Sequence, residues 1–131
     1  MRKENKVSLW LGNFESEEEF ENYIYIDYDE DGDYIPSIFQ KEFGISYYDE
    51  DFSELVWFSE KTKKFSTLLK DFSYSSQIID LFKPMLGGVN IEEYNCVMLL
   101  YNYEHSNSDK DGVSKEHKVI FIGAGDVNYE V

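Results

Sequence analysis

The sequence predicts an α+β fold with a mostly antiparallel sheet of about four strands and about four helices. Strand-like runs rich in branched and aromatic residues open the chain, recur near its middle and close it, and segments with helical spacing lie between them. The resulting order, β-α-α-β-α-α-β-β, is typical of an α+β domain. The length of 131 residues predicts a single domain over 1–131.

The first strand and the first helix have clear sequence signals. Residues 6–12 (KVSLWLG) alternate, with Trp10 on the face opposite to its leucine neighbours, so we expect both faces of this strand to be covered. The S-E-E-E run that starts at Ser16 is a capping box and predicts a helix over 16–26. Its acidic first turn suits the positive end of the helix dipole.

A second short helix is predicted between two acidic loops. Pro36 is expected as its first residue, because proline is well tolerated at that position. Gly44 is expected to end the helix. The predicted buried face consists of Ile35, Ile38, Phe39 and Phe43.

The middle of the chain predicts one strand and two helices. The run 52–58 favours a strand, because aromatic and branched residues dominate it. A helical face is predicted within 61–72. The next helix is expected to be capped by Ser75 or Ser76 and to end just before Pro84.

The last third of the chain predicts a C-terminal β-hairpin with a long polar loop. Residues 94–104 and 118–125 have strong strand composition, and the connection EHSNSDKDGVSKEH is polar and rich in turn residues. We expect His105 and His117, at the ends of this connection, to be solvated. Metal binding by these histidines with Asp109 and Asp111 lacks any metal-ligand spacing.

The net charge of -15 comes almost entirely from one block of sequence. Residues 15–54 contain fifteen acidic residues and one basic residue, whereas 1–14 carry a net +2 and 55–131 a net -3. Such a field attracts a cationic partner and disfavours direct binding to nucleic acid. Cys96 is the only cysteine and lies in an apolar run, so we expect a buried thiol in a reducing, cytoplasmic compartment. We expect no signal peptide and no membrane segment, because no apolar run is long enough.

One stretch resembles a calcium loop but is incomplete. Asp27, Asp29, Asp31 and Gly32 match the start of an EF-hand. The loop then requires a bidentate glutamate at its twelfth position, which is Ile38 here. We therefore expect no bound metal, although weak ion binding by the clustered carboxylates stays open.

Other catalytic chemistry has little support, and we expect no catalytic residues and no cofactor. Asp49, Glu50 and Asp51 could serve a carboxylate-dependent hydrolase only if they faced a partner across a cleft. No serine lies in a nucleophile elbow and no phosphate-binding loop is present.

The remaining candidate is an acidic surface rich in tyrosine. Tyrosine offers apolar area and a hydroxyl at a low entropic cost, and carboxylates pair well with arginine, so the combination suits a basic protein partner. A solvated acidic face whose tyrosines pack inward is the alternative. The predicted partner-binding residues are Tyr28, Asp29, Glu30, Asp31, Asp33, Tyr34, Tyr47, Tyr48, Asp49, Glu50 and Asp51.

The order of several motifs resembles the immunity protein 22 family of bacterial polymorphic toxin systems. The similar stretches are VSLWLGNF, SEEEFENYI, YDEDGDYIPSIFQKEFGI, YYDEDF, YNCVMLLYNYE and VIFIGAG. The resemblance implies a cytoplasmic, non-enzymatic protein that binds and neutralises a cognate toxin. It also implies fold roles for Trp10, Gly12, Phe39, Phe43 and Phe52, a match of Ser37 to the central helix, and either toxin binding or capping for Asp49 and Asp51.

We therefore expect an immunity protein whose toxin has a basic surface, as a nuclease has. A nucleic-acid mimic that inhibits a DNA-binding protein shares the same electrostatics and remains the alternative. A small hydrolase is a less favoured third. The binding interpretation makes a geometric prediction: the short helix between the loops 27–34 and 47–51 should bring them together into one face.

Overall fold

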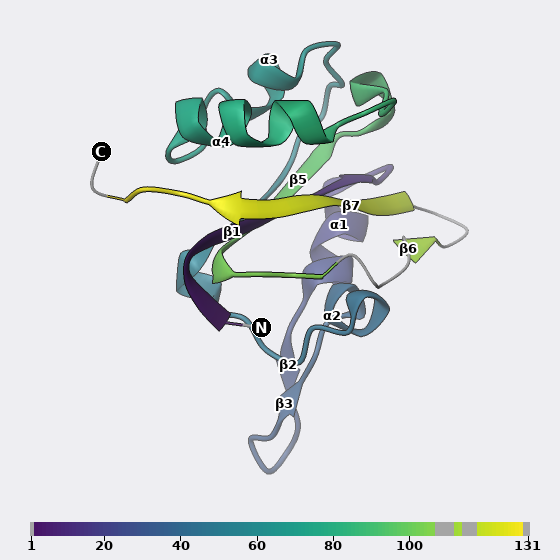
Figure 1. The fold of residues 1–131 in the computed structure, drawn as a ribbon. Coiled ribbons are helices and arrows are strands. Elements are labelled where there is room, and N and C mark those ends of the chain that lie inside the picture. Colours follow the sequence, from purple (N-terminus) through teal and green to yellow (C-terminus); the bar gives the residue numbers. More distant parts are fainter. Residues whose placement is uncertain (1, 107–111, 114–117, 130–131) are drawn as a thin grey trace.

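The computed structural model describes residues 2–106, 112–113 and 118–129. Their main sheet has five strands in the order β4-β5-β1-β7-β6, and every neighbouring pair is antiparallel (Figure 1). The α+β class with an antiparallel sheet is confirmed. The strands are β1 (Arg2–Asn13), β4 (Ser53–Trp57), β5 (Cys96–Tyr103), β6 (Gly112–Val113) and β7 (Lys118–Asp126).

The pairing of the last two long strands differs from the predicted hairpin. β5 and β7 do not pair with each other, because β1 lies between them. Leu9 of β1 is opposite Leu99 on one side and Gly123 on the other. The apolar character of β1 on both faces suits this central position. The hairpin partner of β7 is the two-residue strand β6.

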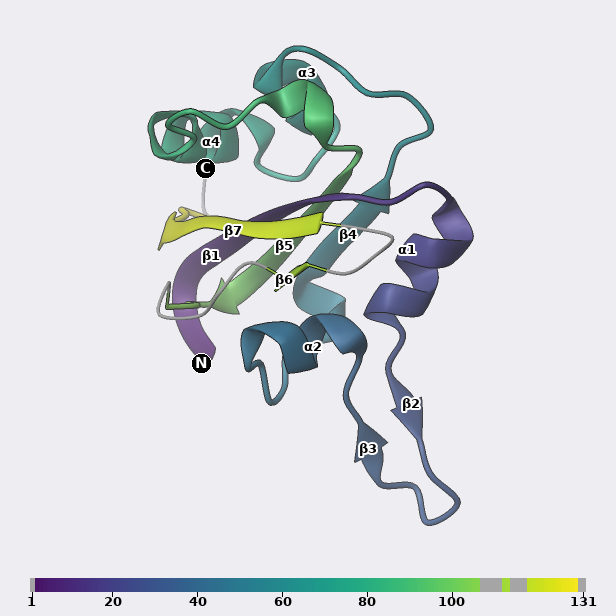
Figure 2. The same ribbon diagram turned by 90° about the vertical axis from the view of Figure 1, so that its right-hand side faces the viewer.

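Two layers of helices cover the two faces of the sheet (Figures 1 and 2). Among the described residues, no helix is both long and apolar enough to cross a membrane. The helices on one face are α1 (Glu17–Ile24) and α2 (Ile38–Phe43), and those on the other are α3 (Phe65–Leu69) and α4 (Ser75–Phe82). Short 3-10 turns also occur at η1 (Glu50–Phe52), η2 (Lys83–Met85) and η3 (Ile91–Glu93).

Alternating side chains of the strands build two separate cores. In β5, Val97 and Leu99 pack toward α3 and α4, whereas Met98 and Leu100 pack toward α1 and α2. Trp10 is fully buried in the second core, as its position opposite to the leucines predicts. Each fully buried large apolar side chain contributes about 1.5–3 kcal/mol, so the sheet is stabilised from both faces.

The close approach of β1 and β5 explains why residue 12 is glycine. A Cβ atom at Gly12 would lie 2.6 Å from the Sγ atom of Cys96 and 3.0 Å from the Phe14 ring. Cys96 is buried, as expected, and burial raises the pKa of its thiol.

The helix boundaries follow the capping side chains. Ser16 precedes α1 and accepts a hydrogen bond from the Glu19 amide. α2 begins at Ile38 rather than at Pro36, because Ser37 accepts from the Gln40 amide and forms a full capping box with it. Gly44 ends α2 in the left-handed conformation, with φ of 68°, as predicted.

Two further expectations need correction. In α2, Phe39 and Phe43 are fully buried, but Ile35 and Ile38 are exposed, because they lie before and at the first turn, away from the sheet. α4 has no side-chain cap at its start. Ser75 and Ser76 lie inside the helix, and Tyr74 precedes it.

The first acidic loop is a small β-hairpin. Its strands are β2 (Asp27–Tyr28) and β3 (Tyr34–Ile35), and they pair in a separate antiparallel sheet. Both ribbon views show this hairpin projecting away from the main sheet beyond α2 (Figures 1 and 2). An element that projects in this way presents most of its side chains to solvent.

Candidate partner-binding surface

A row of three tyrosine rings joins the two acidic loops. Tyr28 and Tyr34 are opposite each other in the hairpin, with ring centroids 6.0 Å apart. Tyr34 in turn lies 5.7 Å from the ring of Tyr47, which follows α2. The structure thus places the loops 27–34 and 47–51 next to each other, with α2 between them in sequence. We refer to Tyr28, Tyr34 and Tyr47 as the tyrosine row.

The cap of α2 holds the tyrosine row in place. Gln40 is buried, and its side-chain amide donates a hydrogen bond to the Tyr34 hydroxyl at 2.6 Å. The side-chain oxygen of Gln40 accepts from the Ser37 amide at 2.8 Å. One residue therefore links the first turn of the helix to the base of the hairpin. Burial raises the pKa of Tyr34, and the negative charge of Glu50 raises it further.

Adjacent tyrosines after α2 take opposite positions. Tyr47 is 62% exposed, and Tyr28 in the hairpin is 56% exposed. Tyr48, which the sequence predicts on the binding surface, is only 4% exposed and packs in the core beside Phe39. Tyr48 therefore stabilises the fold, because its ring is buried between the exposed Tyr47 and the 3-10 turn that follows. Burial raises the pKa of Tyr48, and Glu50 adds to this shift.

Backbone contacts shape the tip of the hairpin. The Asp29 carboxylate accepts hydrogen bonds from the amides of Asp31 and Asp33, both at 2.9 Å. Gly32 takes a φ of 80°, which the turn requires. One carboxylate oxygen from each of the three aspartates lies within 4.8 Å of the others. The flanking elements are short strands rather than the two helices of an EF-hand, so the EF-hand interpretation is not supported.

The second acidic loop is a capped 3-10 turn. The Asp49 carboxylate accepts from the Asp51 amide at 3.0 Å, so Asp49 has the capping role that the sequence left open. Glu50 and Asp51 are exposed. All three carboxylates lie on one turn, which differs from a catalytic pair placed across a cleft. Phe52, expected to serve the fold, is 47% exposed and belongs to the surface.

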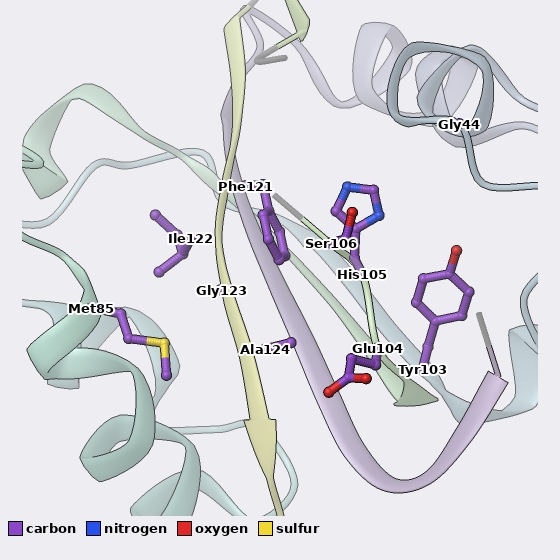
Figure 3. A pocket seen from close by; sticks show the side chains of 10 residues that line it. All are labelled: Gly44, Met85, Tyr103, Glu104, His105, Ser106, Phe121, Ile122, Gly123 and Ala124. Atoms are coloured by element: carbon purple, nitrogen blue, oxygen red, sulfur yellow. The ribbon is translucent and has the colours of Figure 1, made fainter. Parts of the chain in front are cut away.

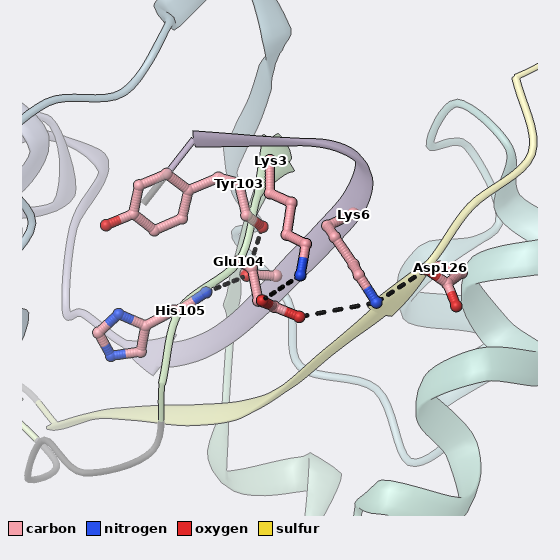
Figure 4. Close-up of polar contacts among 7 residues, drawn as sticks. Lys3, Lys6, Tyr103, Glu104, His105 and Asp126 are labelled. Atoms are coloured by element: carbon pink, nitrogen blue, oxygen red, sulfur yellow. Dashed lines mark hydrogen bonds and ion pairs between the residues drawn. The ribbon is translucent and has the colours of Figure 1, made fainter.

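The basic residues near the N-terminus are paired away from this surface. Lys3 and Lys6 lie 3.3 Å and 3.6 Å from the Glu104 carboxylate, and Lys6 also lies 2.9 Å from Asp126 (Figure 4). These ion pairs join β1 to the residue that follows β5 and to the last residue of β7. The charge segregation of the sequence is therefore kept in the structure, since these lysines pair with Glu104, which directly follows β5, and with Asp126 of β7.

His105 belongs to the core and not to a solvated loop. It is 7% exposed, and its ring centroid lies 4.6 Å from Phe121 and 5.1 Å from Trp10. Its side chain lies beside a pocket of about 760 Å³ between the end of β5 and β7 (Figure 3). The Ser8 hydroxyl accepts from the His105 amide at 3.0 Å, which holds the chain against the sheet after β5. His117, Asp109 and Asp111 lie outside the described residues.

A second group of tyrosines lies outside the binding surface that the sequence predicts. Tyr74, Tyr101 and Tyr129 come from three distant segments and meet with ring centroids 5.3 to 6.3 Å apart. With Phe52 and Glu54 they line a pocket of about 410 Å³, which we call the tyrosine pocket. No sequence signal marks this group, because only the pairing of β4 with β5 and the packing of α4 bring its members together.

The fold and this surface define an α+β protein with an exposed acidic face that carries aromatic side chains. The chain belongs to a known family: the model of the Immunity protein 22 family matches residues 7–130. The family description implies an inhibitor rather than an enzyme, and a toxin as its partner. No curated protein and no solved structure matched the chain.

Proposed function

We propose that this protein neutralises a cognate bacterial toxin by covering a basic surface of that toxin with its own acidic face. The face consists of the tyrosine row and the carboxylates of the hairpin and of the 3-10 turn. The observation that carries the proposal is the contact of Tyr34 with both Tyr28 and Tyr47, which joins two acidic loops into one continuous face.

The chemistry of this face supports a basic protein as the partner. Carboxylates form strong, bidentate hydrogen bonds with arginine, and exposed tyrosines supply rigid apolar area at interfaces. A face of one charge also steers an oppositely charged partner and accelerates association. A toxin that binds nucleic acid has such a basic surface, so a nuclease is the toxin class that fits best. The protein would act in the cytoplasm, where the toxin's targets lie.

A nucleic-acid mimic that blocks a DNA-binding protein remains a second candidate, because the same acidic face would serve it. Binding to the toxin encoded in the same locus, and not to DNA-binding proteins, separates the two proposals.

The test uses five carboxylates of the face that hold no turn in place. Asp29 and Asp49 are kept, because their side chains accept backbone hydrogen bonds. Neutralising the other five should weaken toxin binding by at least tenfold and flatten its salt dependence, because rim charges act mainly through long-range attraction. Affinity is measured by titration calorimetry at low and high salt. The substitutions are Glu30→Gln, Asp31→Asn, Asp33→Asn, Glu50→Gln and Asp51→Asn.

A matched control removes the same number of charges elsewhere. It neutralises five exposed acids outside the face and should leave affinity within about twofold, since surface charges at a distance contribute little. Equal losses in both variants would show that only net charge matters, and an unchanged affinity of the first variant would exclude this face. The control substitutions are Glu60→Gln, Asp71→Asn, Asp80→Asn, Glu92→Gln and Glu93→Gln.

A further inference from the structure

The tyrosine pocket has a rigid wall built around one carboxylate. Glu54 accepts a hydrogen bond from the Tyr101 hydroxyl at 2.6 Å and from the Ser73 amide at 3.1 Å. The Ser73 hydroxyl donates to its other oxygen at 3.4 Å. Across the pocket, the Tyr129 hydroxyl donates to Asn102 at 3.0 Å. These contacts hold a negative charge and several aromatic rings in defined positions.

One strained backbone position, at Tyr74, lies at the same place. Tyr74 and Asn102 both line the pocket, and both have a φ of 56°. Asparagine adopts this conformation readily, whereas a bulky residue such as tyrosine rarely does. At Tyr74 this conformation precedes α4, which receives no side-chain cap there. A strained conformation persists only where the surroundings hold it, and such residues gather at binding sites. The Tyr74 ring packs against the rings of Tyr101 and Tyr129.

The chemistry of the pocket favours a planar, weakly hydrated cation. Asp51 and Glu54 supply negative charge, and none of the described lining residues is basic. The faces of Tyr and Phe rings attract a guanidinium group, which is planar and weakly hydrated. Phe52 and Tyr74, 47% and 37% exposed, leave this aromatic wall open to solvent.

The pocket continues the proposed binding face around the end of β5. Asp51 belongs to both. Tyr101 and Asn102 also line a smaller hollow of about 20 Å³ that is shared with Tyr47 and Asp49. A partner that covers the tyrosine row therefore reaches the pocket without leaving the surface.

We propose that the tyrosine pocket receives an arginine-bearing segment of the partner protein. The guanidinium lies against the tyrosine rings, pairs with Asp51 and is attracted by the negative charge of Glu54. The volume of about 410 Å³ admits residues beside the arginine as well. The identity of the partner as a toxin rests on the proposed function, but the chemistry of the pocket does not.

The first test uses a small probe and needs no toxin. The full-length protein is titrated with N-acetyl-arginine methylamide while its backbone amide signals are followed by NMR. Saturable shifts are expected at Ser73, Tyr74 and Asn102, and the uncharged citrulline analogue should cause none. Shifts that are absent, or that follow the acidic hairpin instead, would overturn the proposal. Glu54→Gln keeps an acceptor oxygen but removes the charge, so it should weaken the probe's affinity severalfold.

The second test uses the toxin. Phe52→Ala combined with Tyr74→Ala should weaken toxin binding by roughly tenfold or more, as the loss of aromatic anchors does at other interfaces. Met85→Ala removes a similarly exposed apolar side chain elsewhere and serves as the control. Unchanged toxin affinity in the double variant, with loss in a variant that neutralises only Glu30, Asp31 and Asp33 of the hairpin, would reject the pocket and keep the proposed function. If no toxin binds the parent protein, the proposed function fails, and the probe titration still decides on the pocket.

Discussion

Tyr47 and Tyr48 show how far neighbouring residues of one type can differ in role. Both lie in the acidic segment after α2, and a sequence pattern gives them the same chemistry. In the structure the first ring is exposed beside Tyr34, and the second is buried against Phe39. Surface exposure therefore decides which tyrosine can contact a partner and which one stabilises the fold.

Alanine substitutions at these two positions should separate binding from stability. Tyr48→Ala removes a buried ring and should lower the free energy of unfolding by about 3–5 kcal/mol, as other large-to-small core substitutions do. Tyr47→Ala should change it by less than about 0.5 kcal/mol and weaken toxin binding about fivefold or more. Urea denaturation and calorimetric titration measure the two effects. Similar losses of stability in both variants would contradict the assigned positions.

At the scale of elements, α2 organises the proposed binding face. Its first turn is closed by the reciprocal bonds of Ser37 and Gln40, and Gln40 continues to the Tyr34 hydroxyl. Its last turn ends at Gly44, from which the chain leads to Tyr47. The six residues of α2 are too few to form a stable helix alone, so its caps and its buried phenylalanines are what maintain it.

Loss of the α2 cap should weaken both the helix and the face. Ser37→Ala removes the acceptor for the Gln40 amide and should cost about 1 kcal/mol of stability. Ser46→Ala, at an exposed position shortly after the helix, should cost less than about 0.5 kcal/mol. Both are measured by urea denaturation. Equal values for the two variants would mean that the capping box contributes no stability.

At the scale of the whole molecule, charge and aromatic side chains are sorted to different places. The acids of 15–54 gather around α1, the hairpin and the 3-10 turn, whereas the N-terminal lysines are paired with Glu104 and Asp126. Several tyrosines are buried as neutral groups. Burial raises the pKa values of Tyr23, Tyr48 and Tyr101, and the carboxylates of Glu42, Glu50 and Glu54, respectively, raise them further.

These raised pKa values predict alkaline instability. In the unfolded chain a tyrosine ionises near pH 10 (about its ordinary value), whereas the buried hydroxyls stay protonated. Their contribution to stability is therefore complete below about pH 10 and is lost progressively as the pH rises above it. Urea denaturation across this range should show the decline. Tyr48→Phe should make it shallower and Tyr47→Phe should not. A decline of the same steepness in all three proteins would contradict the role of Tyr48.

Much of the fold was predictable, because local signals and tertiary packing agree. Three local signals agree with the structure. They are the apolar alternation in β1, the cap at Ser16 and the end of α2 at Gly44. The start of α2 was misplaced at Pro36, because proline and serine are both common near a helix start and only the bond to Gln40 distinguishes them. The predicted pairing of β5 with β7 was wrong, because strand composition carries no information on which strand lies between.

The candidate site also combines features that the sequence determines with features that depend on the tertiary structure. The sequence by itself determined the family, the α+β class and the concentration of acids in one block, because these depend on residue identity and order. Only the tertiary structure decided that Tyr48 is buried, that Tyr34 joins the two loops, and that Tyr74, Tyr101 and Tyr129 share one pocket. Those facts depend on distances between residues far apart in the chain, and such distances are set by strand order and packing.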